Sequence, residues 1–141
     1  MRGDKAALLL FGEEHEIFMG IVEQFIKAKR ITIFGASAQG RKALSFLERL
    51  SKRPSFFVDN DSEKWGKSVE NLKVYPPEKL LERKVDAVII ASSTGEMEIL
   101  SQLRKLGLFE KVYSMEFIEM LVVLKYAFGE IYRCFIEGID R

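Results

Sequence analysis

The residues Ile31-Thr32-Ile33-Phe34-Gly35-Ala36-Ser37-Ala38-Gln39-Gly40 decide the fold of this chain. A run of β-branched and aromatic residues stops at Gly35, and an apolar helical period follows over residues 38–51. The pattern predicts a strand, a tight turn and a helix. In doubly wound α/β domains this turn places a helix N-terminus, with free N–H groups and a positive dipole end, at the carboxyl edge of the sheet. A phosphate can bind there.

Four further short apolar runs predict the rest of a sheet. They cover residues 55–58, 72–75, 85–91 and 111–114. The third is the most apolar, as expected where helices cover both faces of a strand. Helical segments alternate with the runs, so we expect an α/β fold with a parallel five-stranded sheet, strand order 3-2-1-4-5 and helices on both faces.

The segments between the runs carry turn and cap signals. Residues 62–71 are polar and contain Trp65-Gly66, which predicts a loop or the edge of a hairpin. Ser93 and Glu96 have the spacing of a capping box, so a helix is expected to start at Ser93, and Gly107 is expected to end it.

The two ends of the chain predict helices outside this sheet. Apolar residues recur at helical spacing over residues 13–27, and residues 116–136 predict one long helix with more than one apolar face. We therefore divide the chain into an N-terminal helical extension (1–28), a nucleotide-binding domain (29–115) and a C-terminal helix (116–141). The second apolar face suggests contact with another copy of the chain. The alternative is that this helix lies in a groove beside the N-terminal helix.

Composition limits the partners. Lys and Arg number 22 and Asp and Glu 21, so bulk charge favours neither nucleic acid nor an acidic membrane surface, although a basic patch can hide in a neutral total. One cysteine, Cys134, and one histidine, His15, argue against a disulfide framework and a Cys/His metal site. The apolar runs are too short to span a bilayer. We expect a soluble, cytoplasmic protein without membrane insertion or a nucleic-acid partner.

The glycine turn is the first candidate binding element. Gly35, Ser37 and Gly40 match the spacing G-x-G-x-x-G, with serine at the middle position. The first glycine permits the tight turn and the third lets helix and strand approach each other, whereas the middle one normally admits the pyrophosphate. A serine there takes up room, but its hydroxyl can donate to a phosphate.

Asp59 is the second candidate. It follows Gly40 by nineteen residues and ends the second predicted strand, where a carboxylate can accept hydrogen bonds from a ribose diol. Because a carboxylate repels a 2′-phosphate, NAD(H) is preferred to NADP(H) if the ligand is a dinucleotide. The alternative is that Asp59-Asn60-Asp61 is a turn that ends the strand.

Two further groups have open roles. Arg41 and Lys42 lie in the first turn of the predicted helix, where their positive charges are unfavourable beside the positive end of the helix dipole. A bound pyrophosphate would make these charges favourable. The alternative is that both are solvated helix residues. Ser92, Ser93 and Thr94 end the fourth strand and can cap the next helix or contact ribose or phosphate. We find no catalytic constellation. The candidate cofactor-binding residues are Gly35, Ser37, Ala38, Gln39, Gly40, Arg41, Asp59, Asn60, Ser92 and Ser93.

Several stretches resemble a known type of domain. They are residues 33–41, 57–61, 64–67, 74–78 and 86–91. Together they look like the Rossmann-type domain of bacterial surface-polysaccharide proteins, found at the N-terminus of nucleotide-sugar dehydratases and epimerases. The resemblance covers residues 29–117. It implies a nucleotide-type ligand held by Gly35, Ser37, Gly40 and Asp59, with the chemistry in another domain.

The expected function is therefore a nucleotide-binding module that is non-catalytic alone, serves nucleotide-sugar or polysaccharide metabolism and forms a homo-oligomer through its terminal helices. NAD(H) is the first ligand expected, with CoA or a nucleotide sugar as alternatives. A second hypothesis is a small NAD-dependent oxidoreductase or sugar-nucleotide dehydrogenase completed by a dimer partner. A third is a redox-sensing regulatory subunit.

Overall fold

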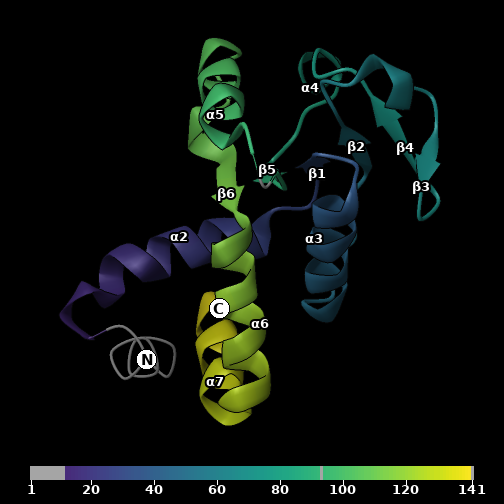
Figure 1. The fold of residues 1–141 in the computed structure, drawn as a ribbon. Coiled ribbons are helices and arrows are strands. Elements are labelled where there is room, and N and C mark those ends of the chain that lie inside the picture. The colour runs from purple at the N-terminus through teal and green to yellow at the C-terminus, as the bar shows by residue number, and fades with distance from the viewer. Residues whose placement is uncertain (1–11, 93, 141) are drawn as a thin grey trace. The chain divides into compact units, whose positions relative to one another are not determined.

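The computed structural model describes residues 12–92 and 94–140 of the chain (Figure 1). It divides into two compact units. One is Lys29–Glu119, and the other is Met1–Ala28 together with Met120–Arg141. None of the helices in the described ranges is long and apolar enough to cross a membrane.

The first unit contains a mostly parallel sheet of six strands. Its parallel strands are β1 (Ile31–Phe34), β2 (Phe56–Val58), β4 (Leu72–Tyr75), β5 (Ala87–Ile90) and β6 (Val112–Ser114). Their spatial order is β4-β2-β1-β5-β6, which is the predicted order 3-2-1-4-5. The neighbours of β1 are therefore β2 on one side and β5 on the other.

A sixth strand corrects the predicted count of five. β3 (Ser68–Val69) pairs antiparallel with β4 at the edge of the sheet. The connecting residues Glu70 and Asn71 both have positive φ, 50° and 69°, as the two central residues of a type I′ hairpin turn require. A two-residue strand is too short to show an alternating pattern, so the sequence allowed only a loop or a hairpin edge here.

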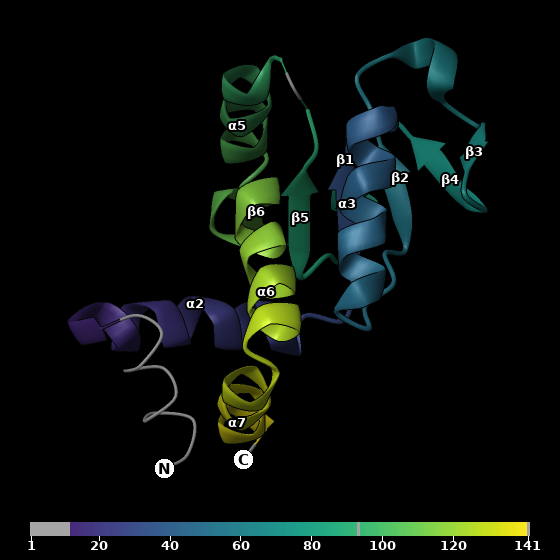
Figure 2. The ribbon, with the colours of Figure 1, turned by 60° about the horizontal axis from the view of Figure 1, so that its bottom comes forward.

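Helices cover both faces of this sheet. α3 (Ala38–Arg49) buries Ala43, Leu44 and Leu47 and lies in front of β1 and β2 in Figure 2. α4 (Lys79–Glu82) and α5 (Glu96–Lys105) contribute Leu80, Ile99 and Leu103 to one apolar core. That core also contains residues of the sheet, namely Phe34, Phe56, Val58, Val88 and Ile90.

The start of α5 differs from the predicted capping box. The helix begins at Glu96 and its N-cap is Gly95, whose φ is +75°. Glu96 is therefore the first helical residue, whereas a capping box needs it to be the third. Ser93 itself lies outside the described residues. At the other end, Gly107 follows the C-cap Leu106 with φ +76°, as expected for a helix-ending glycine.

Two short 3₁₀ turns connect elements of the first unit: η2 (Ser62–Lys64) and η3 (Phe109–Lys111). A third, η1 (Gly12–Glu14), directly precedes α2 in the second unit. The second unit contains α2 (His15–Lys27), α7 (Gly129–Asp140) and the greater part of α6 (Met115–Ala127), which begins in the first unit. The side chain of His15 lies outside the described part of the chain.

The prediction of one helix over residues 116–136 is wrong. α6 ends at Ala127 and α7 begins at Gly129. Phe128 continues the apolar stripe, which hid the break, but the neighbouring glycine weakens a helix and permits a change of direction. Self-association through these helices stays a prediction. Val123, Tyr126 and Phe128 are more than half exposed, at 54%, 67% and 51%.

Candidate functional site

A cavity of about 360 Å³ lies at the carboxyl ends of β1, β2 and β5. We call it the crevice. It is lined by Phe34, Gly35, Ser37, Asp59, Asn60, Lys64, Ala91, Ser92, Thr94, Gly95, Glu98 and Ile99. From β1 the chain continues to β2 and β4 on one side of β1, and it later returns to form β5 and β6 on the other side. The crevice between β1 and β5 therefore lies at the topological switch point. Open α/β sheets bind their ligands at this position.

Two glycines shape the turn under the crevice. Gly35 has φ +118°, and a Cβ atom there would lie 2.2 Å from the carbonyl oxygen of Ala91. A Cβ atom on Gly40 would lie 2.0 Å from the carbonyl oxygen of Gly35. Both contacts are with backbone, which has little freedom to move away. The turn between β1 and α3 therefore requires glycine at both positions, as the sequence pattern predicts.

Ser37 is the N-cap residue of α3 and lines the crevice. Its side chain is exposed and makes no capping hydrogen bond, so the hydroxyl can meet a ligand. The first bond of the helix runs from the N–H of Arg41 to the carbonyl of Ser37, 3.0 Å. The amides before Arg41 have no acceptor within a helix, which leaves donors and a positive dipole end beside the crevice.

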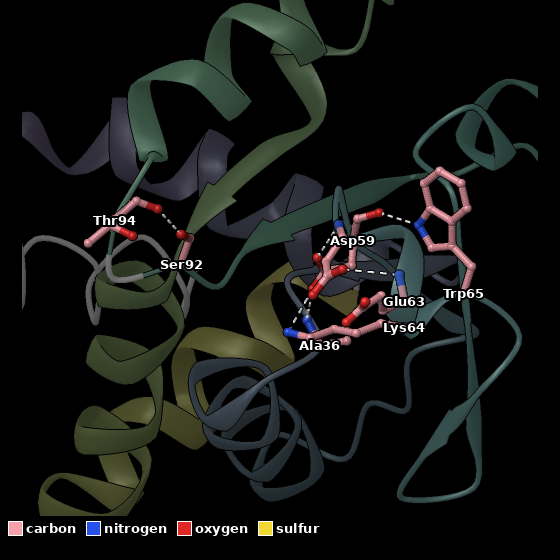
Figure 3. A network of polar contacts seen from close by, with 8 residues as sticks. Ala36, Asp59, Glu63, Lys64, Trp65, Ser92 and Thr94 are labelled. Atoms are coloured by element: carbon pink, nitrogen blue, oxygen red, sulfur yellow. Dashed lines mark hydrogen bonds and ion pairs between the residues drawn. The ribbon is translucent and has the colours of Figure 1, made fainter.

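Asp59 braces this turn (Figure 3). Its Oδ2 accepts a hydrogen bond from the N–H of Ala36 (2.8 Å) and lies 3.6 Å from the Lys64 ammonium group. Its Oδ1 accepts from the N–H of Asp61, 2.8 Å. The side chain of Asp59 is 13% exposed. Because a carboxylate has about four lone-pair positions, Asp59 retains acceptor capacity for a ribose hydroxyl while it holds the end of β2 against the glycine turn.

Lys64 and Trp65 complete this side of the crevice. The 3₁₀ turn η2 brings Lys64 to Asp59, and the indole N–H of Trp65 donates to the carbonyl of Asp59, 2.6 Å. The ammonium group offsets the negative charge of Asp59. The sequence argument that Asp59 would repel a 2′-phosphate did not take this neighbouring cation into account. The only sequence signal for Lys64 was its place in the stretch Lys64-Trp65-Gly66-Lys67, one of the stretches that carry the resemblance.

Asn60 and Ser92 both line the crevice, and both side chains form hydrogen bonds with other parts of the protein. The Asn60 amide exchanges two hydrogen bonds with the amide of Gln102 on α5, 3.1 and 3.0 Å. The Ser92 hydroxyl donates to the carbonyl of Thr94 (Figure 3). A ligand that uses either group must compete with these bonds. Ser93 lies outside the described residues.

A second cavity of about 290 Å³ adjoins Ser92 on the side of α3 and α6; we call it the side cavity. It is lined by Gln39, Lys42, Phe46, Ile90, Ser92, Glu96, Met115, Glu116 and Glu119. Ser92 is common to both cavities. Glu116 and Glu119 belong to α6 and Glu96 to α5, so no single local motif pointed to the three glutamates together.

The predicted residues thus separate into three groups. The crevice brings together Gly35, Ser37, Asp59, Asn60 and Ser92. Gln39 lines the side cavity. Ala38, Gly40 and Arg41 line neither, and Gly40 acts through its contact with Gly35. Thr94, which was considered together with Ser92 and Ser93, also lines the crevice. Lys64, Gly95 and Glu98 line it although the sequence analysis did not propose them as binding residues.

The sheet order, the glycine turn and the position of the crevice define a Rossmann-like α/β domain. Residues 27–113, more than half of the chain, match the model of a family described as C2185-like, N-terminal. The chain therefore belongs to the C2185-like family through this N-terminal domain.

Comparison with solved structures supports the fold. The chain is similar to the crystal structure of UDP-D-quinovosamine 4-dehydrogenase from Vibrio fischeri, with a TM-score of 0.50 and 18% sequence identity. The similarity covers 61% of this chain and 75% of that one. At this identity it shows a shared fold. No curated protein matches the sequence.

Proposed function

We propose that this domain binds a nucleotide with a pyrophosphate group and works in nucleotide-sugar or polysaccharide metabolism, with NAD(H) as the first ligand and CoA or a nucleotide sugar as alternatives. The observation that carries the proposal is the crevice at the switch point, where Ser37, the N-terminus of α3 and Asp59 converge. The solved structure of a UDP-sugar dehydrogenase with the same type of fold supports the metabolic context.

The pyrophosphate lies at the N-terminus of α3 in this proposal. Free amides, the positive end of the helix dipole and the hydroxyl of Ser37 all favour an anion there. The ammonium group of Lys64 adds a positive charge on the other side of the turn. The ribose meets Asp59, whose carboxylate can accept a hydrogen bond from a ribose hydroxyl in addition to the two that it accepts from backbone N–H groups.

The domain is non-catalytic alone in this proposal. Its polar crevice residues bind and orient, and the reaction belongs to another domain or protein. Cytoplasmic location is part of the same proposal, since nucleotide sugars and NAD(H) are cytoplasmic metabolites.

Ligand binding can be measured by differential scanning fluorimetry with NAD(H), NADP(H), CoA and UDP-sugars. A ligand at a hundred times its Kd stabilises the folded state by about 2.7 kcal/mol and raises the melting temperature. Trp65 gives an independent signal because it is the single tryptophan of the chain, is 40% exposed and bonds to Asp59.

Ser37→Asp and Ser37→Asn separate binding from folding. Both residues are good N-caps, so α3 should form in either variant. The aspartate carboxylate would repel a pyrophosphate at the helix N-terminus, whereas asparagine would not. We expect Ser37→Asp to lose the thermal shift and Ser37→Asn to keep most of it. Equal shifts in the two variants, or no shift of folded wild-type protein with any of these ligands, would contradict the proposal.

A further inference from the structure

A third cavity, of about 300 Å³, lies at the opposite edge of the sheet from the crevice. Its lining residues are Arg30, Ser55, Phe56, Arg83, Lys84 and Val85, and we call it the basic pocket. Arg30 precedes β1, Ser55 precedes β2, and Lys84 and Val85 lead into β5. Since β1 lies between β2 and β5 and all three are parallel, the amino ends of three neighbouring strands form this pocket.

The lining carries three positive charges and no carboxylate. Among the described residues, the guanidinium groups of Arg30 and Arg83 and the ammonium group of Lys84 form no ion pair and no hydrogen bond. The Arg83 guanidinium lies over the ring of Phe56, 6.0 Å from its centroid. Glu82, next to Arg83 in the chain, pairs instead with Lys79 at 3.3 Å. Three like charges around one cavity repel one another unless an anion offsets them.

The neighbouring charged groups are already occupied. The Asp86 carboxylate accepts hydrogen bonds from the N–H groups of Lys29 and Arg30, 3.0 and 2.9 Å. Arg53 pairs with Glu48 and donates to the carbonyl of Glu70. Asp86 and Arg30 attract each other at longer range, but Asp86 does not line the pocket. The positive charges that line the pocket without a direct ion-pair partner among the described residues are therefore those of Arg30, Arg83 and Lys84.

We propose that the basic pocket binds a phosphomonoester, separately from the nucleotide in the crevice. Guanidinium groups bind phosphate oxygens through paired N–H donors, and the Lys84 ammonium group and the Ser55 hydroxyl add donors of their own. Phe56 and Val85 are buried apolar walls, so the cavity offers an apolar surface to the organic part of such a ligand.

The two sites occupy opposite ends of the same strands. Arg30 stands before β1 and Gly35 directly follows it. Gly35 follows Arg30 by five residues, and at about 3.3 Å per residue the extended chain separates the sites by roughly 16 Å. One site can therefore be occupied or disabled without the other, and failure of the nucleotide proposal leaves this one standing.

The test is a titration of ¹⁵N-labelled protein with inorganic phosphate, and then with glycerol 3-phosphate, at constant ionic strength held by sodium chloride. Amide resonances of Arg30, Ser55, Lys84 and Val85 should shift and saturate. The titration is repeated on Ser37→Asp, in which the crevice is made unfavourable for anions, and the shifts at the basic pocket should persist.

The double variant Arg83→Gln/Lys84→Gln tests the charges. We expect its Kd for phosphate to rise about tenfold or more, because two charge-assisted contacts are lost. Lys67→Gln/Lys73→Gln, which removes two positive charges from exposed positions beside and within the β3–β4 hairpin, is the matched control and should leave the Kd unchanged.

Three results would overturn the proposal. They are shifts that never saturate, shifts confined to the crevice, and an equal loss of affinity in the double variant and its control. If the double variant does not fold, Arg30→Gln replaces it, and the map of shifts on the wild-type protein decides the location without any variant.

Discussion

The two turns that border the crevice use glycine for different physical reasons. After β1, a Cβ atom on Gly35 or Gly40 would lie 2.2 or 2.0 Å from a backbone oxygen. After β5, Gly95 has φ +75°, but a Cβ atom there would have no other atom within 4 Å. The first turn is fixed by backbone packed on backbone, whereas the second is set only by its own torsion angle. The first can act as a rigid support for a ligand, and the second leaves room for one.

Substitution of Gly40 by alanine should break the packed turn and have the largest effect. The new methyl group would overlap the Gly35 carbonyl, so we expect a loss of about 3 kcal/mol in the free energy of unfolding or failure to fold. Urea unfolding followed by circular dichroism measures it. Gly20→Ala in α2 is the control: a Cβ atom there has open space, and the change should stabilise by roughly 0.5 to 1 kcal/mol. A Gly40→Ala protein as stable as wild type would disprove the packing argument.

Asp59→Ala should loosen the same turn by removing its brace. The N–H groups of Ala36 and Asp61 would lose their acceptor, and we expect destabilisation of about 2 kcal/mol. Asp61→Ala is the matched control, since its carboxylate accepts one exposed bond, from the N–H of Glu63. It should cost about 0.5 to 1 kcal/mol by the same urea measurement. Equal losses in the two variants would mean that Asp59 does not brace the turn.

Gly95→Ala tests the open turn. Only the left-handed backbone opposes alanine there, so the expected cost is about 1 kcal/mol. Gly95→Asn should cost less, because asparagine adopts positive φ more readily than alanine does. Thermal unfolding compares the two. A loss as large as that of Gly40→Ala would show that this turn is as tightly packed as the first.

Asp86 directly precedes β5 and therefore lies at the amino ends of the strands, away from the two glycine turns. Hydrogen bonds from the N–H groups of Arg30 and Lys29 hold the pKa of Asp86 below its ordinary value. A carboxylate with a lowered pKa stabilises the folded state above its unfolded pKa, near 3.8, and this contribution disappears as the pH falls through the folded pKa. Wild type should therefore exceed Asp86→Asn in stability at pH 7, and the difference should narrow below about pH 4. A difference that is constant with pH would rule out this role.

Much of the fold could be predicted because burial on two faces leaves a strong local signal. β1 and β4 have the predicted bounds, and the order of the parallel strands follows from strand and helix alternation with right-handed crossovers. β3 was not predicted as a strand because two edge residues carry no period. The break at Phe128 was missed because its aromatic side chain fits the apolar stripe on both sides. The start of α5 was misplaced because the spacing of Ser93 and Glu96 imitates a capping box.

The candidate site was predicted only in part, for a related reason. Gly35, Ser37 and Asp59 could be found from their spacing, because β1 and β2 are neighbours and their carboxyl ends meet. Lys64, Glu98 and the glutamates of the side cavity could not, because each reaches its cavity through a turn or crossover that the linear order does not encode.

The sequence by itself determined the strand, the turn and the helix of residues 31–40, since glycine and β-branched residues restrict the backbone locally. It also determined the nearly balanced charge of the chain. The tertiary structure alone decided where those charges gather. Parallel pairing places Arg30 and Lys84 at neighbouring strand ends with Arg83 beside them, and η2 folds Lys64 onto Asp59. Charge interactions depend on distance in space, and only the folded chain sets those distances.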